Sequence, residues 1–96
     1  MYRAVIAGYY RSPFTLAKKG ALIDIKPDEL LSEVIKNLIS KTKVNLEDIE
    51  DVIIGCAFPE GEQGFNIGKL VTFLSGMNIK TAGTTINRWC GSSMEA

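Results

Sequence analysis

Short apolar runs alternate along this chain with segments whose apolar residues recur at helical spacing, and this alternation is the strongest constraint on the fold. The runs Ala4–Ala7, Val52–Ala57 and Thr84–Asn87 are predicted to form strands, the first of them buried on both faces. Between them, Pro27–Ile39 and Ile67–Leu74 carry apolar side chains three and four residues apart, which predicts two helices. This order is typical of an α/β protein with a mainly parallel sheet, a βαβαβ arrangement with right-handed crossovers.

Local signals predict where the helices begin and end. Pro27 suits a first helical position, where a backbone N–H is not needed. Asn66 is predicted to cap the second helix and Gly76 to end it. Asn45 is predicted to cap a short helical turn over Leu46–Ile49.

Composition excludes several classes of function. The chain balances 11 Lys and Arg against 11 Asp and Glu without a basic block, which argues against a nucleic acid or an anionic membrane surface as partner. No apolar stretch approaches the roughly 20 residues of a membrane span, and the N-terminal run is too short for a signal peptide. With two cysteines in 96 residues, we expect a cytoplasmic protein of one marginally stable domain whose thiols stay reduced.

Cys90 is the candidate nucleophile. It follows the third predicted strand and precedes Gly91-Ser92-Ser93, where a helix is predicted to begin. In parallel α/β sheets, chemistry collects at this edge, and a helix start there favours the thiolate. Backbone N–H groups at the turn could also stabilise an oxyanion. The alternative is a small thiol buried in the core.

The other candidate residues have simpler interpretations. Cys56 continues an apolar strand and is predicted to be an inert core thiol. Trp89 is either a packing residue or a wall of a substrate pocket. Arg88 either steadies negative charge near Cys90 or forms a surface ion pair.

Several apparent motifs carry no function. Gly61–Lys69 resembles a phosphate-binding loop, but its glycine spacing is wrong and Leu70 replaces the required Ser or Thr. The adjacent carboxylate pairs have no metal-site spacing, so no metal site is predicted. The chain contains no histidine, so a catalytic cysteine here must take its base from elsewhere.

The segment Asn87–Met94, Asn-Arg-Trp-Cys-Gly-Ser-Ser-Met, closely resembles the nucleophile motif of thiolases, the acyl-CoA acetyltransferases. Ala4–Gly8 with Arg11–Pro13 is similar to the family's opening strand and its Arg-Thr-Pro turn, with Ser12 in place of Thr. Glu62–Asn66 is similar to a loop of the 3-ketoacyl-CoA branch that degrades fatty acids. The resemblance runs in order through essentially the whole chain.

The resemblance implies a thiolase-like layered α/β fold, of which residues 1–96 are an incomplete part of the N-terminal domain. It implies that Cys90 becomes acylated and that its own backbone N–H contributes to an oxyanion hole. The implied reaction is thiolysis of a 3-ketoacyl-CoA to acetyl-CoA, or the reverse Claisen condensation, with acyl-CoA and coenzyme A as substrates and no permanently bound cofactor. It also implies a homo-oligomer, a dimer or a tetramer.

The family's catalytic histidine, second catalytic cysteine and most coenzyme A contacts lie beyond Ala96, so the chain alone is expected to be inactive. In the family the opening strand is central in its sheet, so we also expect an unpaired strand edge here. Three alternatives stay open. The first is a related condensing enzyme such as a ketoacyl synthase, the second is a truncated, non-catalytic product that oligomerises or binds a partner, and the third is a redox-sensing thiol at Cys90.

Overall fold

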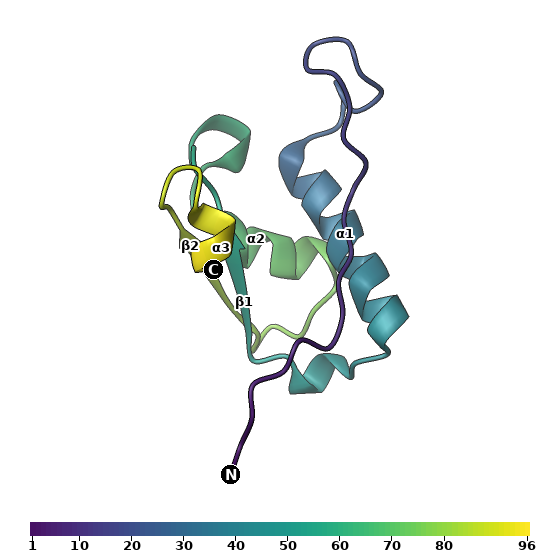
Figure 1. Cartoon of the computed structure of the whole chain (residues 1–96), viewed down its shortest axis with the longest axis vertical. Helices are drawn as coiled ribbons and strands as arrows, with labels where there is room; N and C mark the ends of the chain where they lie inside the picture. The colour runs from purple at the N-terminus through teal and green to yellow at the C-terminus, as the bar shows by residue number, and fades with distance from the viewer.

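The computed structural model describes residues 1–96 and contains a two-stranded parallel sheet with helices around it (Figure 1). The elements follow in the order α1 (Pro27–Thr42), η1 (Leu46–Asp48), β1 (Asp51–Gly55), η2 (Gly61–Gln63), α2 (Ile67–Leu74), β2 (Ala82–Ile86) and α3 (Ser92–Glu95), where η denotes a 3-10 turn. Figure 1 shows α2 between α1 and the two strands, and α3 beside the sheet near the C-terminus. The α/β class predicted from the sequence is confirmed.

The two strands pair in parallel, and α2 is the crossover between them. Their register runs from Asp51 opposite Ala82 to Gly55 opposite Ile86. The ladder continues one step beyond β1, because the Cys56 N–H donates to the Ile86 carbonyl at 2.9 Å. The β1–α2–β2 unit therefore brings the residues after both strands to the same edge of the sheet.

The predicted first strand, Ala4–Ala7, is wrong for this structure. Residues 1–16 form no helix or strand, and Val5 and Ile6 are 78% and 96% exposed instead of buried on both faces. A strand exists only where a neighbour completes its hydrogen bonds, and no backbone N–H of residues 1–15 forms a backbone hydrogen bond. The expected βαβαβ arrangement is therefore reduced to one βαβ unit with α1 packed on it.

The N-terminal segment instead runs alongside α1 before the chain loops back into that helix (Figure 1). Lys41 of α1 attaches to it by a contact with Tyr9. The Lys41 ammonium lies 4.4 Å from the centre of the Tyr9 ring and donates to the Tyr9 carbonyl at 3.3 Å. This exposed contact links the N-terminal segment to α1.

Helix α1 begins at Pro27 as predicted and continues three residues past the predicted Ile39, to Thr42. It ends where Lys43 adopts a left-handed conformation, with φ of 56°. The longest helix of the chain is this one, at 16 residues, and none is long and apolar enough to span a membrane.

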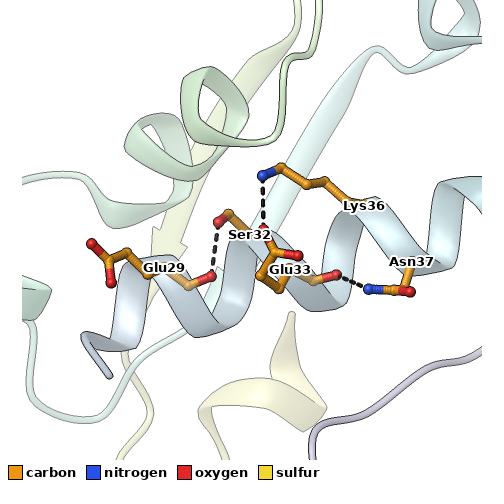
Figure 2. Close-up of polar contacts among 5 residues, drawn as sticks. All are labelled: Glu29, Ser32, Glu33, Lys36 and Asn37. Carbon is orange, nitrogen blue, oxygen red and sulfur yellow. Dashed lines mark hydrogen bonds and ion pairs between the residues drawn. The ribbon is translucent and has the colours of Figure 1, made fainter. Parts of the chain in front are cut away.

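Polar side chains of α1 bond mainly within the helix, as Figure 2 shows. Ser32 is buried, and its hydroxyl donates to the Glu29 carbonyl at 2.8 Å. Lys36 forms an ion pair with Glu33 at 2.8 Å, and Asn37 donates to the Glu33 carbonyl at 2.8 Å. These contacts satisfy the helix locally and leave its apolar side to pack on α2.

The two ends of α2 follow the sequence signals differently. Gly76, with φ of 72°, ends the helix as predicted: its N–H donates to the Phe73 carbonyl, and the next N–H bonds back to Thr72. Asn66 stands at the N-cap position, but its side chain makes no cap bond, so that prediction is wrong. Its amide instead donates to the Gly83 carbonyl of β2 at 2.7 Å, which fixes the helix start to the strand. Asn45 does cap its short turn, accepting from the Glu47 N–H at 3.2 Å.

The buried core is small and lies between α1, α2 and β1. Its fully enclosed members are Cys56, Ile67 and Val71, with Leu31, Ile35, Val52 and Ile54 packed around them. Helix α2 approaches the sheet closely because neither Gly68 nor Gly83 has a side chain. A Cβ on Gly68 would collide with the Thr84 backbone, and one on Gly83 with the Lys69 backbone.

Candidate active site at the Cys90 turn

Cys90 lies on the tight turn that joins β2 to α3, where the sequence predicted it. The strand ends at Ile86 and α3 begins at Ser92. The Cys90 thiol is exposed, and the Cys90 backbone N–H donates to no oxygen of the chain. The buried-thiol alternative therefore does not hold for Cys90, and both its sulfur and its N–H are available to a ligand.

The residue before Cys90 has a strained backbone. Trp89 has φ of 47°, in the left-handed region that bulky residues avoid at a cost of about 1–3 kcal/mol. Hydrogen bonds on both sides hold it there. Its N–H donates to the Asn87 side-chain oxygen at 3.0 Å, and the Gly91 N–H donates to the Arg88 carbonyl at 3.0 Å. These hydrogen bonds therefore fix the backbone conformation of Trp89, the residue that sets the direction of Cys90.

The buried Ser92 side chain fixes this turn by hydrogen bonds to its backbone. It is 4% exposed, and its hydroxyl accepts from the Arg88 N–H at 2.8 Å while donating to the Trp89 carbonyl at 2.6 Å. The sequence predicts a helix start at the Gly-Ser-Ser segment but carries no signal for the role of this residue. Nothing in the sequence distinguishes Ser92 from its exposed neighbour Ser93.

The turn rests on the end of β1 through a glycine. A Cβ on Gly55 would collide with backbone atoms of Ser92 and Ser93, so the start of α3 lies directly on the strand. Helix α3 is a single turn and gains its position from this contact and not from its own length.

Trp89 and Arg88, for which the sequence allows two interpretations each, have defined contacts in the structure. Trp89 packs edge-to-face against Phe58 of the loop after β1, with ring centroids 5.9 Å apart. Arg88 forms an ion pair with Glu95 at 2.8 Å, its side chain 70% exposed. In this structure Arg88 therefore forms a surface ion pair, and the Trp89 ring stays mostly exposed beside its contact with Phe58.

Cys56 is buried in the core, as predicted, and both cysteines are free thiols. A surface groove of about 510 Å³ lies beside the turn, lined by Pro59, Phe65, Asn66, Gly83, Thr84, Thr85 and Asn87. Cys90 lines none of the four surface cavities. The turn thus presents an exposed thiol and one backbone N–H without a partner in the chain, and the chain holds no histidine to act as a base.

Comparison with known proteins shows which family the chain resembles. The model of the family described as "Thiolase, N-terminal domain" matches residues 4–96. A 3-ketoacyl-CoA thiolase of Bacillus subtilis is 36% identical over 96 residues, covering 100% of this chain and 25% of the relative. A 3-ketoacyl-CoA thiolase of Colwellia psychrerythraea is 40% identical over 97 residues, with the same coverage of 100% and 25%. One of Acinetobacter baumannii is 38% identical over 92 residues, covering 96% of this chain and 24% of the relative. The chain thus spans about a quarter of the length of these curated relatives.

Proposed function

We propose, from the premise that this chain belongs to the thiolase family, that Cys90 is the acyl-accepting nucleophile of a thiolase-type acyltransferase. The observation that carries the proposal is the exposed Cys90 thiol on a strained turn whose own N–H is unpaired. In this proposal, residues 1–96 form part of a thiolase N-terminal domain.

The proposed reaction has two half-reactions. In the first, the Cys90 thiolate adds to the keto carbon of a 3-ketoacyl-CoA, and the Cys90 N–H donates to the oxyanion that forms. Collapse of this adduct breaks the bond between the second and third carbons, leaving the shortened acyl group on sulfur and releasing acetyl-CoA once its carbanion takes a proton. In the second, the thiol of coenzyme A takes the acyl group and returns Cys90 to the thiolate. Condensation is the same sequence in reverse.

The chemistry requires a general base and an acid that this chain does not carry. The sequence has no histidine, so the base comes from residues outside these 96, and the chain alone is proposed to be inactive. Coenzyme A enters as a substrate and not as a resident cofactor. The names of the relatives, all 3-ketoacyl-CoA thiolases, support the substrate class. We extend the proposal to fatty acid β-oxidation and to a cytoplasmic location, with which two free thiols accord.

Complementation with the missing sequence tests this proposal. The chain is mixed or coexpressed with a polypeptide covering the other three quarters of the Bacillus subtilis relative, and acetyl-CoA formation from acetoacetyl-CoA and coenzyme A is measured. Cys90→Ala should abolish the activity, whereas Cys56→Ala should retain it because Cys56 is enclosed in the core. Peptide mass mapping should find the acyl group on Cys90. Activity that persists in Cys90→Ala would contradict the assignment.

A second candidate is a non-catalytic module that oligomerises or binds a partner, and the exposed apolar side chains of the N-terminal segment favour it. Val5, Ile6 and Phe14 are 78%, 96% and 92% exposed. Sedimentation of the purified chain measures its mass in solution. A dimer or tetramer would support self-association, and a monomer would contradict it.

A further inference from the structure

The Ser92 hydroxyl makes two hydrogen bonds to the backbone that precedes Cys90, although it makes none to the thiol and lines none of the four surface cavities. It accepts from the Arg88 N–H at 2.8 Å and donates to the Trp89 carbonyl at 2.6 Å, and the residue is 4% exposed. Ser93, the next residue, is exposed and its side chain makes no hydrogen bond in the structure. The two adjacent serines thus differ both in burial and in side-chain hydrogen bonding.

The Trp89 carbonyl and the Cys90 N–H belong to the same peptide group. No peptide bond of the chain is cis, so the C=O and the N–H of this group point in opposite directions. With the carbonyl drawn inward to the buried Ser92 hydroxyl, the N–H of Cys90 is directed away from the protein. This explains why the Cys90 N–H has no partner in the chain.

We propose that Ser92 is a positioning residue that aims the Cys90 N–H at the acyl oxygen during acyl transfer. The inference rests on the proposed function, because the oxyanion exists only if Cys90 attacks a carbonyl. Without the hydroxyl, the strained Trp89 can relax from its φ of 47° toward the ordinary negative region and rotate the shared peptide plane. The donor then no longer lies where the oxyanion forms.

The effect of losing the hydroxyl is partial, because a second bond remains. The Ser92 backbone N–H also donates to the Trp89 carbonyl, at 3.2 Å, and a substitution of the side chain leaves it in place. Removal of a whole oxyanion donor lowers rates by about 10²–10³-fold. Misalignment of the donor in Ser92→Ala should therefore lower acylation by roughly tenfold.

Two reactions of the same thiol separate donor alignment from general exposure. Acetylation of Cys90 by p-nitrophenyl acetate passes through an oxyanion: the thiolate adds to the carbonyl, and p-nitrophenolate then leaves. Alkylation by iodoacetamide displaces iodide from carbon and forms no oxyanion. The ratio of the two rates, measured on the full 96-residue chain by peptide mass mapping of Cys90, cancels changes in thiol access and ionisation.

The ratio should fall roughly tenfold in Ser92→Ala, recover in Ser92→Thr, and stay within twofold of the parent in Ser93→Ala. If Ser92→Ala lowers both rates together, or neither, Ser92 is only a structural residue and the inference is wrong. Equal loss in Ser92→Ala and Ser92→Thr would likewise contradict a role for the hydroxyl. The parent chain provides the separate check on the proposed function. If its ratio when folded equals that in urea, the Cys90 N–H stabilises no oxyanion and the inference about Ser92 fails, whereas the complementation assay with Cys90→Ala decides the proposed function.

Discussion

Replacement of Gly55 by alanine tests whether α3 and the Cys90 turn owe their position to direct contact with β1. The added Cβ would overlap the Ser93 nitrogen and the Ser92 carbonyl carbon. These are backbone atoms, so rotation of a side chain cannot relieve the overlap, and α3 must move away from the strand. Gly55→Ala therefore perturbs the fold and the site through one contact.

Two effects of opposite sign decide the magnitude. Alanine reduces the freedom of the unfolded chain, which stabilises the fold by about 0.4–1 kcal/mol. Overpacking against fixed atoms destabilises it by about 1–3 kcal/mol. The second effect is larger, and we expect the free energy of unfolding to fall by about 1–2 kcal/mol. For a chain of this size the melting temperature should fall by roughly 5–15 °C.

Thermal unfolding followed by far-UV circular dichroism measures the stability. Trp89 is the one tryptophan of the chain, so its fluorescence reports on the turn itself. The emission of Trp89 and the alkylation rate of Cys90 should both change in Gly55→Ala. Gly91→Ala is the matched control, one residue before the α3 backbone that Gly55 contacts: its φ is −96°, and a Cβ there would meet only the Arg88 carbonyl oxygen at 3.5 Å. A Gly55→Ala chain that melts at or above the parent temperature, with unchanged Cys90 reactivity, would refute the reasoning.

Two further substitutions probe the elements that hold the sheet and α2. Gly76→Ala places a side chain at φ of 72°, where there is open space but an unfavourable backbone, and should lower the free energy of urea unfolding by about 1 kcal/mol; a more stable variant would contradict this. Asn66→Ala removes both side-chain bonds to β2 and should lower the same quantity by about 1–2 kcal/mol, with Asn66→Asp intermediate because it keeps the acceptor. Equal stability of the alanine and aspartate variants would show that the bond accepted from the Thr85 hydroxyl contributes nothing.

The helices could be predicted from the sequence because their signals are local. Pro27 can begin a helix whatever lies around it, and Gly76 can end one because only its own backbone must turn. The polar side chain of Asn66 fits two roles equally well, since capping a helix and bonding a strand both require an amide beside a backbone group. Its choice of β2 depends on how closely α2 lies on the sheet, and that distance is set by Gly68 and Gly83. No pattern within the helix itself contains this information.

The first apolar run shows the opposite limit of sequence reasoning. Ala4–Ala7 has the composition of a buried strand, but a strand requires a neighbour at its edge, and the pattern of a segment says nothing about whether that neighbour is present. In this structure the segment lies along α1 with its apolar side chains exposed. The prediction of β1 and β2 succeeded because each of these strands has the other as its partner within the chain.

The same distinction holds at the candidate site. Some of its features follow from a sequence motif, and others depend on contacts formed only in the folded chain. The position of Cys90 between β2 and α3 could be predicted because the strand and the helix start on either side of it have local signals, and its neighbours resemble a known motif. The left-handed Trp89 could not, since tryptophan has no preference for that conformation, and its hydrogen bonds with Asn87 and Ser92 and the bond from Gly91 to Arg88 hold it there. The position of the Cys90 thiol is therefore local information, whereas the direction of the Cys90 N–H is not. If Ser92 sets the direction of the Cys90 N–H, then a chain that keeps the cysteine and loses the hydroxyl would keep a reactive thiol. Its Cys90 N–H would no longer be aligned with the acyl oxygen.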